Sequence, residues 1–324
     1  MKLTDNKTEN NRVEGFCLIK SVEKKTSSKN TVYLDLMLID RGGEINAKIW
    51  EYNAGAHDAL APDKVVKIRG VVDIYQGREQ LRIDKIRLSE PDDEIEMSEL
   101  VPCSPYDSQW MYDELCGIAD SFKNSDLKAI VSCLLEQYRD ELLVCPAAVK
   151  MHHAFRGGLL YHTLTLIRLA EGLCPVYPFI DKDLLFAGII LHDSAKIFEL
   201  SFTEAGVAGS YTVEGQLIGH LVKGAIELET ASIKLGIPKE ITLKLQHMVL
   251  SHHGEPDFGS PVRPLFIEAE VLNQLDTMDA KIYEMAQELE KVKPGEFTDR
   301  VWALDQRKLY KHTEKADNFK SKLD

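Results

Sequence analysis

Histidine and aspartate side chains gather in one part of the sequence. Eight of the ten histidines lie between residues 152 and 253. Imidazole and carboxylate groups together suit zinc, manganese, iron and similar divalent cations. His192 and Asp193 stand side by side at the end of the apolar run LLFAGIIL, and Lys196 follows three residues later. Because burying a carboxylate without a partner is costly, this pair indicates a charged site inside the protein.

Further candidate ligands lie on other predicted helices of the same region. A lone histidine on an apolar helix is more often a hydrogen-bonded core residue, and a single aspartate can form an ordinary ion pair. Several helices that each bring a ligand to a shared interior are typical of helical metal enzymes. The additional candidates are His162, His220, His252, His253 and Asp276. The set as a whole predicts a metal centre inside a helical domain.

Residues 106–315 show the spacing of α-helices. Apolar side chains recur at i, i+3 and i+4 in seven segments of this range. Gly236 ends one segment and Pro238 begins the next, as helix capping preferences predict. We expect an all-α bundle here, followed by a charged tail, residues 316–324, that frays.

Residues 1–90 contain a domain of a different kind. Five β-branched and aromatic segments alternate in polarity between residues 13 and 90, and a short helical piece, AGAHDALAP, separates the third from the fourth. This order predicts an all-β OB-fold barrel. Residues 91–105 are acidic and contain three prolines, so we expect a linker between the two domains.

The charge of the chain is unevenly distributed. The net charge of the 324 residues is −13, but residues 1–90 hold 16 Lys and Arg against 14 Asp and Glu, and the remainder holds 23 against 38. The first part can approach a polyanion, while the second would repel one unless metal or local basic groups intervene. This balance disfavours a general nucleic-acid coat and leaves room for an enzyme with a local channel.

The remaining bulk features predict a cytoplasmic protein. No run of about 18 apolar residues is present, so we expect no membrane span, and the polar start lacks a secretory signal. The six scattered cysteines contain no CxxC pair and are expected to be free thiols. The sequence leaves the oligomeric state open, and a homo-oligomer is compatible with it.

The predicted barrel offers side chains for nucleic acid. OB barrels bind single strands through a basic groove and stacking aromatic rings. The candidates are Tyr33, Trp50, Tyr75 and Arg78. Since half of a barrel's aromatic residues belong to its core, core and stacking roles both stay open for Trp50, whereas Tyr75 is expected to be exposed. A net charge of +2 predicts modest affinity for single-stranded RNA or DNA.

The order of the candidate ligands resembles a known signature. His162, His192-Asp193 and Asp276 resemble the H…HD…D pattern of the HD-domain metal-dependent phosphohydrolases, and His220 and His252-His253 resemble the added ligands of its dinuclear branch. The stretches HHAFRGGLLYHT, LLFAGIILHDSAKIFEL, YTVEGQLIGH and LSHHGEPDFGSPVRP, behind an OB-like domain, are similar to the YhaM-type 3′–5′ exoribonucleases. The resemblance extends from about residue 13 to residue 310. In one departure, Ala195 stands where many HD proteins have a glycine.

The resemblance implies two divalent cations. His162, His192, Asp193 and Asp276 would hold one ion, and Asp193 would bridge to a second ion held by His220, His252 and His253. Such a pair lowers the pKa of bound water and neutralises charge on the attacked phosphate. Manganese is the cation that the family suggests, although the mixed ligands also admit iron, cobalt or zinc. Lys196 and Arg156 would bind the phosphate oxygens beside catalytic Asp193.

We therefore expect a 3′–5′ exoribonuclease that hydrolyses single-stranded RNA, and potentially single-stranded DNA, to nucleoside 5′-monophosphates. One alternative is an HD-type phosphohydrolase of nucleotides or cyclic dinucleotides, which would not need a separate strand-binding barrel. A second alternative is a non-catalytic OB/HD regulator that binds nucleic acid, against which the complete ligand set argues.

Overall fold

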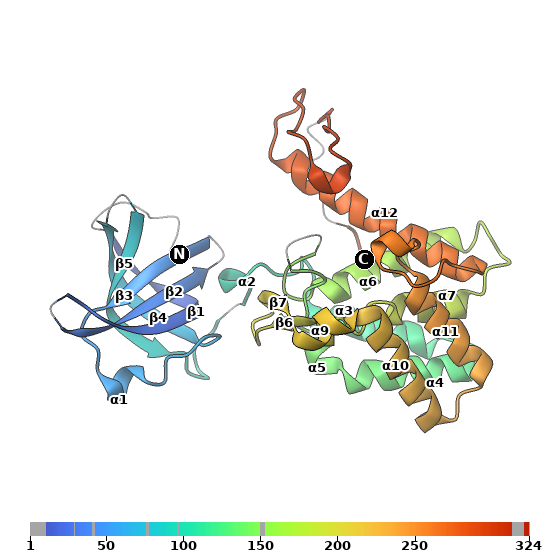
Figure 1. The fold of residues 1–324 in the computed structure, drawn as a ribbon, viewed down its shortest axis with the longest axis horizontal. Helices are drawn as coiled ribbons and strands as arrows, with labels where there is room; N and C mark the ends of the chain where they lie inside the picture. Colours follow the sequence, from blue (N-terminus) through green and yellow to red (C-terminus); the bar gives the residue numbers. More distant parts are fainter. Residues whose placement is uncertain are drawn as a thin grey trace. The chain divides into compact units, whose positions relative to one another are not determined.

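The computed structural model describes residues 11–28, 30–40, 43–75, 78–95, 97–149, 153–312 and 321–323, without the side chains of Arg78 and Phe258. The chain divides into two compact units (Figure 1). Unit 1 comprises the chain up to Cys103 together with Thr203–Val207, and unit 2 comprises Ser104–Phe202 and the chain from Ala208 onward.

Unit 1 is a closed five-stranded barrel. Its strands pair in the order β1-β2-β3-β5-β4, and β1 closes the barrel against β4. This is the OB-fold order, with a short helix between the third and fourth strands, so the expected fold is confirmed. The elements are β1 (Arg12–Thr26), β2 (Val32–Asp40), β3 (Gly43–Ile49), α1 (Ala54–His57), β4 (Val65–Tyr75) and β5 (Arg78–Leu88).

The barrel closes because its strands alternate in polarity. Leu34, Leu36 and Leu38 of β2 point into the core, while Asp35 between them faces outward and pairs with Lys25 at 2.7 Å. Gly70 on β4 has no room for a side chain, since a Cβ there would lie 2.3 Å from the carbonyl oxygen of Arg82 on β5. Unit 1 therefore has its own hydrophobic core.

The segment expected to be a linker, residues 91–105, is partly folded against unit 1. It forms α2 (Met97–Leu100), and Leu100 and Val101 are buried against Leu18, Ile39 and Ala205. These apolar side chains, which the acidic composition of the segment obscures, extend unit 1 to Cys103.

Unit 2 is helical, with one small hairpin. Its helices are α3 (Ser108–Asp120), α4 (Ser125–Gln137), α5 (Arg139–Leu142), α6 (Gly158–Leu173), α7 (Lys182–Leu191), α8 (Lys196–Glu199), α9 (Val213–Leu217), α10 (Gly219–Leu235), α11 (Lys239–Ser251) and α12 (Ile267–Glu290). The strands β6 (Leu200–Phe202) and β7 (Ala208–Tyr211) form the hairpin, which the sequence did not predict. The all-α character of this part of the chain is otherwise confirmed.

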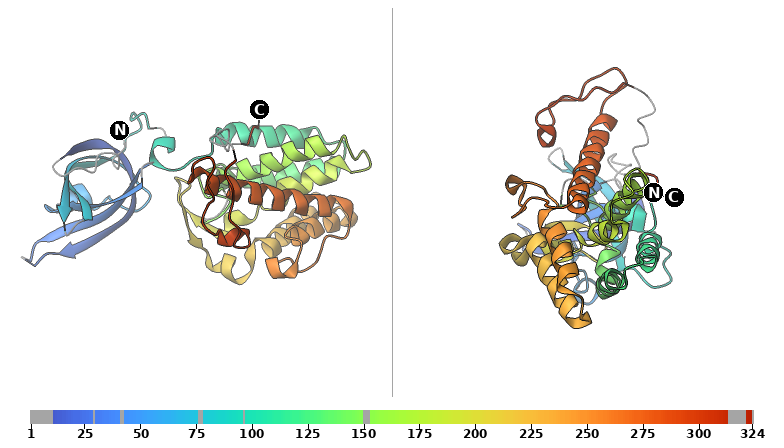
Figure 2. Two further views of the ribbon diagram at one scale, coloured as in Figure 1. Left: turned by 90° about the horizontal axis from the view of Figure 1, so that it is seen from above. Right: turned by 90° about the vertical axis from the view of Figure 1, so that its right-hand side faces the viewer.

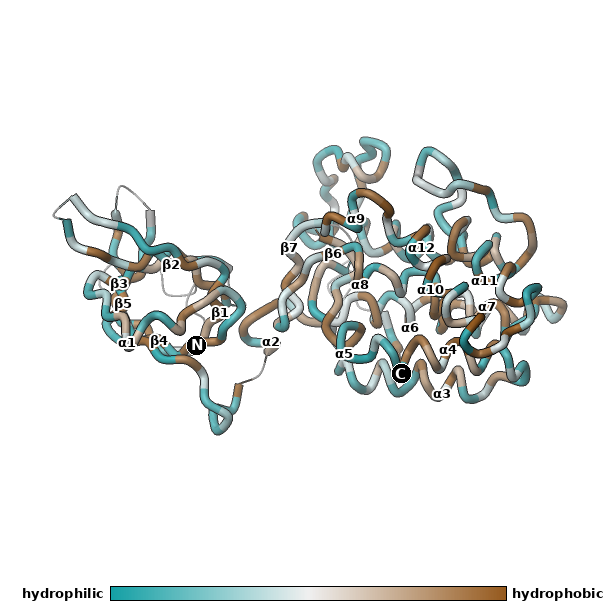
Figure 3. Tube along the Cα trace, turned by 60° about the horizontal axis from the view of Figure 1, so that its bottom comes forward, coloured by the Kyte–Doolittle hydropathy of each residue, from teal (hydrophilic) through white to brown (hydrophobic). Residues whose placement is uncertain are grey.

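The apolar helix α7 lies in the middle of the bundle. All residues from Leu184 to Leu191 are buried, so this helix has no polar face and must be covered on every side. It packs against α4, α6, α11 and α12, and Figure 2 shows these long helices side by side. In Figure 3 the outer helices alternate between hydrophilic and hydrophobic stretches. The Asp181 side chain caps the start of α7 by accepting the Leu184 N–H at 3.1 Å.

The end of the chain returns to unit 2. The prediction that the last residues fray is wrong for residues 321–323: Leu323 is buried in the helical core, and its carbonyl oxygen accepts a hydrogen bond from Arg168 at 2.8 Å. The rest of the predicted tail, residues 316–320 and Asp324, lies outside the described residues. No helix in the described part of the chain is long and apolar enough to cross a membrane.

Candidate metal centre

Five helices bring the seven candidate ligands together. His162 lies inside α6 and Asp276 inside α12. His192 and His252 occupy the C-caps of α7 and α11, where the chain turns away and leaves each side chain at the helix end. Asp193 and His253 follow these two caps, and His220 is the second residue of α10. Three overlapping groups of these side chains place their nitrogen and oxygen atoms within 4.8 Å of one another: His162, His192 and Asp193; His192, His252 and Asp276; and His220, His252 and His253.

Asp193 stands between the two sets of histidines. Its Oδ2 lies 3.3 Å from His192 Nε2 and 2.7 Å from Lys196 Nζ. Its Oδ1 lies 3.3 Å from His220 Nε2 and 3.5 Å from His252 Nε2. One carboxylate oxygen therefore faces each set, which is the disposition that a bridging ligand requires.

Several buried polar atoms at this place make no hydrogen bond with the part of the chain that the structure describes. They include His192 Nε2, His252 Nε2, both ring nitrogens of His220 and Asp193 Oδ1. Buried polar atoms are normally hydrogen-bonded, so a cluster of exceptions needs an explanation. Imidazole nitrogens and a carboxylate oxygen that converge in this way fit a divalent cation.

Backbone carbonyl groups orient two of the histidines. His192 Nδ1 lies 2.7 Å from the Ile189 carbonyl oxygen, and His252 Nδ1 lies 2.8 Å from that of Val249. A carbonyl oxygen can only accept, so Nδ1 carries the proton in both rings. Each Nε2 then presents its lone pair toward Asp193, as a metal ligand must.

The electrostatics favour neutral and anionic ligands at the centre. Burial lowers the pKa of His252 to about 3, which keeps this ring neutral at physiological pH. Burial would raise the pKa of Asp193, but Lys196 and His192 hold it well below its usual range. His162 differs, because burial disfavours its charged form while Asp276 and Asp279 raise its pKa to about 10. A cation at His162 Nε2 would therefore take the place of a proton.

The two predicted phosphate-binding residues are placed differently. Lys196 begins α8 on the same side as Asp193 and pairs with it, so the structure brings this residue to the centre. Arg156 lies in the loop before α6, where its carbonyl oxygen accepts the Ser104 N–H at 2.9 Å. A role in substrate binding stays a prediction for both residues.

Three polar residues that the sequence reasoning did not single out lie directly behind the ligands. Asp279 Oδ2 is 2.8 Å from His162 Nδ1, and Glu199 Oε2 is 2.9 Å from His220 Nδ1. Asn273 donates to the carbonyl oxygen of His252 at 2.7 Å. A signal for two of them exists in the sequence, because Asp279 follows Asp276 by three residues and Glu199 follows Lys196 by three, on the same helix face.

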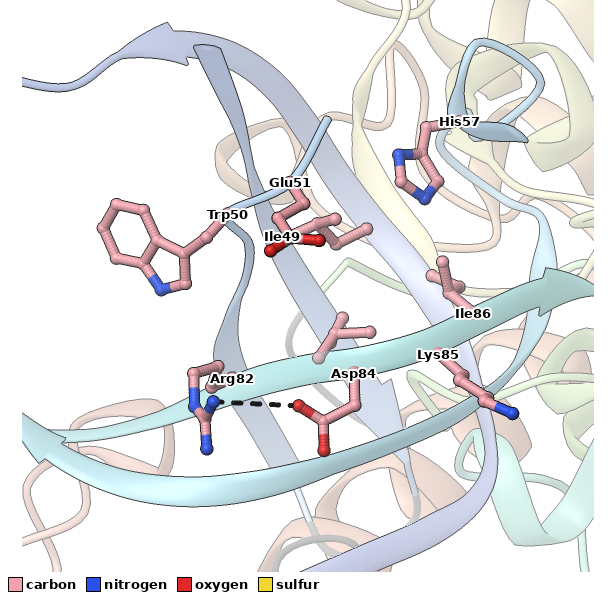
Figure 4. Close-up of a pocket in the computed structure, with 9 residues that line it drawn as sticks. Ile49, Trp50, Glu51, His57, Arg82, Asp84, Lys85 and Ile86 are labelled. Carbon is pink, nitrogen blue, oxygen red and sulfur yellow. Dashed lines mark ion pairs between the residues drawn. The ribbon is translucent and has the colours of Figure 1, made fainter. Parts of the chain in front are cut away.

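The barrel carries a groove that opens between β3 and β5. These strands pair only from Asn46 to Lys48 with Gln80 to Arg82, and beyond this point they separate. The groove has a volume of about 520 Å³ and is lined by basic, acidic and apolar side chains from the end of β3 and the two residues after it, from α1 and from β5 (Figure 4). Trp50 and Arg82 lie at one end of it, and His57 and Lys85 lie at the other.

Three of the four residues predicted to contact nucleic acid, Tyr33, Trp50 and Tyr75, lie on the outside of the barrel. Tyr33 and Trp50 pack together with ring centroids 4.8 Å apart, and Lys48 Nζ lies within 5.1 Å and 5.5 Å of their centroids. Trp50 remains 43% exposed, and Tyr75 is 63% exposed, as expected. The side chain of Arg78 lies outside the described residues, so its predicted contact stays a prediction.

Comparison with known proteins identifies similar chains. Residues 159–281, which include all seven candidate ligands, match the HD domain family. The chain is 40% identical over 300 residues to the 3′–5′ exoribonuclease YhaM of Geobacillus sp. (strain WCH70), covering 93% of this chain and 92% of that protein. It is 40% identical over 302 residues to the protein of the same name from Bacillus subtilis (strain 168), covering 93% and 95%. A solved structure of the second OB-fold domain of replication protein A from Methanococcus maripaludis is 15% identical, with a TM-score of 0.23, and covers 30% of this chain and 98% of that one.

Proposed function

The chain belongs to the family of the 3′–5′ exoribonuclease YhaM, and from this membership we propose that it hydrolyses single-stranded RNA from the 3′ end and releases nucleoside 5′-monophosphates. The relatives match both the barrel and the helical unit, since the similarity covers 93% of the chain. The proposed function therefore covers both units: a metal-dependent hydrolase in the helical unit and a barrel that binds the single strand.

The observation that carries this proposal is the position of Asp193 between two sets of inward-facing imidazoles. We assign His162, His192, Asp193 and Asp276 to one divalent cation. Asp193, His220, His252 and His253 would hold the second. When bound, such a pair supplies water of lowered pKa and neutralises charge on a phosphodiester. We propose manganese as the cation, and the nitrogen and oxygen ligands also accept iron, cobalt or zinc.

Lys196 and Arg156 have the chemistry to bind the phosphate. Burial lowers the pKa of Lys196, but the attraction of Asp193 outweighs this effect and raises the pKa on balance, so Lys196 stays charged. Its Nζ can turn from Asp193 toward a phosphate oxygen without leaving the centre, since a lysine has three donors. Arg156 immediately precedes Gly157, the N-cap of α6, which is the helix that carries His162. Both would fix the scissile phosphate while water attacks it.

The barrel would hold the single strand. Its outer face offers Tyr33, Trp50 and Lys48 as a ring platform with a cation, and Arg82 and Lys85 line the neighbouring groove. Stacking on aromatic rings tolerates any base, while lysine and arginine follow the phosphates. This combination suits an enzyme that must hold RNA of any sequence.

The two other functions fit the chain less well. A phosphohydrolase of nucleotides or cyclic dinucleotides has no use for the exposed platform on the barrel. A non-catalytic regulator would not need to keep three buried imidazole nitrogens pointed at a carboxylate, which costs stability without a cation.

A digest with manganese tests the proposal. A single-stranded RNA labelled at its 5′ end should shorten one nucleotide at a time, and the same RNA labelled at its 3′ end should release labelled mononucleotide at once. EDTA should stop both reactions, and a parallel reaction on free nucleotides should show no turnover. Endonucleolytic fragments, or faster hydrolysis of mononucleotides than of RNA, would overturn the proposed activity.

A further inference from the structure

An oxygen atom lies close behind the Nδ1 of each of the four buried histidines at the centre. Backbone carbonyl groups hold His192 and His252. Carboxylates occupy the corresponding position behind the other two rings, Asp279 behind His162 and Glu199 behind His220. A side chain, unlike a backbone carbonyl, can be replaced, so its contribution can be measured.

Asp279 fixes the tautomer of His162. Its Oδ2 accepts hydrogen bonds from His162 Nδ1 at 2.8 Å and from His153 Nε2 at 3.0 Å. An ionised carboxylate has no proton to give, so His162 Nδ1 must be the donor. The other nitrogen, Nε2, lies 3.1 Å from Asp276 Oδ1 and faces the proposed ligand set. Asp279 is buried, so water cannot substitute for it.

Glu199 approaches His220 at two points. Its Oε1 accepts the backbone N–H of His220 at 3.3 Å, and its Oε2 lies 2.9 Å from Nδ1, an ion-pair distance at which the ring nitrogen does not have hydrogen-bond geometry. Gly219, with φ +73, makes the turn that starts α10 at this carboxylate. Gly215 leaves no space behind Glu199, because a Cβ there would lie 2.3 Å from the Glu199 carbonyl oxygen. The backbone around Glu199 is therefore closely packed.

We propose that Asp279 and Glu199 are positioning residues, one for each metal ion. Asp279 orients His162 and increases the electron density of its ring at the first ion, and Glu199 does the same for His220 at the second. Neither carboxylate is a ligand. The inference rests on the proposed two-metal site and goes beyond it by dividing the supporting carboxylates between the two ions. Loss of a partner of this kind lowers metal affinity about 10- to 100-fold.

Manganese titration of the full-length, metal-free protein tests the division. We expect the wild type to bind two ions. Asp279→Asn and Glu199→Gln keep the shape of each side chain. Each should lower the affinity for one manganese ion about 10- to 100-fold and leave the affinity for the other ion unchanged. The matched controls are Glu290→Gln, an exposed carboxylate on α12, and Glu214→Gln, a half-exposed carboxylate on α9; both should titrate as the wild type does. Thermal melting in EDTA shows whether each variant is folded. If Asp279→Asn does not fold, the inference is tested with Glu199→Gln alone.

Double variants show whether each carboxylate acts through its histidine. Asp279→Asn should have no further effect on manganese affinity in a His162→Ala protein but its full effect in a His220→Ala protein, and Glu199→Gln should show the opposite pattern. Affinities of the single variants equal to the wild type, or equal effects in both backgrounds, would overturn the inference. A wild type that binds none of manganese, iron, cobalt and zinc would instead overturn the proposed function, so the two failures are distinguishable.

Discussion

Asp193 contacts both sets of histidines and Lys196, so its replacement should affect both hydrolysis and stability. Its two oxygens face the two sets of histidines, and Oδ2 also pairs with Lys196 at 2.7 Å. Asp193→Asn keeps the volume and most contacts of the side chain but removes the negative charge that two cations would share. We expect hydrolysis to fall by more than about 100-fold, since even an outer-shell partner is worth about 10- to 100-fold. A folded Asn variant with unimpaired activity in saturating manganese would show that the assignment is wrong.

Replacing the same residue by alanine should also affect stability. Asp193→Ala leaves the largely buried Lys196 ammonium without its carboxylate, and breaking a buried pair in this way costs about 3–5 kcal/mol. We expect the Ala variant to melt at a lower temperature than the Asn variant, whose amide oxygen can still accept a hydrogen bond from Lys196, while both lack activity. Equal melting temperatures would mean that Lys196 finds another partner.

His247 links the loop after α11 to that helix in a pH-dependent way. Its Nε2 accepts the backbone N–H of Leu265 at 3.0 Å, and burial lowers the pKa of His247. When the hydrogen bond to Leu265 is broken, the His247 ring gains a proton near its ordinary pKa of about 6.5. While the bond is intact, the ring is protonated only at a lower pH. The stabilising contact is therefore complete above about pH 6.5 and is lost as the pH falls. Exchange of the Leu265 amide should be faster at pH 5.5 than at pH 7.5 after correction for intrinsic rates, and His247→Gln, which keeps an acceptor without titrating, should remove the difference.

At this scale the sequence predicts ligands better than their supports. The order of His162, His192, Asp193 and Asp276 is a recognisable pattern of residue types. The role of Asp279 depends on its distance from a histidine 117 positions away, which no spacing rule encodes. A carboxylate one helical turn from a ligand is common on exposed helix faces too, so the tertiary fold is needed to identify the one that matters.

Among the elements, long helices follow from periodicity and short ones do not. The helical spacing of apolar residues continues through residues 181–197, whereas the structure has α7, a turn at His192 and Asp193, and then α8. Beyond this turn, Lys196 Nζ lies 2.7 Å from Asp193 Oδ2. The β6–β7 hairpin was missed because its strands have only three and four residues, too few for an alternating pattern to appear.

The outer face of β2 and β3 should be the strand-binding platform. Leu34 and Asp35 pair with Ile49 and Lys48, which places Tyr33 and Trp50 opposite each other on the same outer side. Trp50→Ala should weaken binding of a single-stranded oligoribonucleotide by about 1–3 kcal/mol, the value of one base–ring stack. Fluorescence anisotropy with labelled RNA measures the change. Trp302→Ala removes an indole that is 81% exposed in unit 2 and should leave the affinity unaltered. Equal losses for both variants would exclude the barrel face as the specific platform.

For the whole molecule, the division of charge predicts a division of labour. Residues 1–90 have a net charge of +2, whereas residues 104–324 hold 23 Lys and Arg against 33 Asp and Glu, so the helical unit by itself should attract long RNA poorly. Removing the barrel should therefore reduce kcat/KM for a 30-nucleotide RNA much more than for a dinucleotide, which reaches the metal centre without it. The truncation should start at Ser104, since a protein that starts at residue 91 would keep Leu100 and Val101 without Leu18 and Ile39 to cover them. Val207 packs against the same cluster and would be exposed by the truncation, so it should be replaced by serine in the truncated protein to limit aggregation. An equal loss of kcat/KM on both substrates would mean that the barrel supports catalysis itself. If charge separates the affinities of the full-length and truncated proteins for long RNA, added salt should reduce the difference between their kcat/KM values.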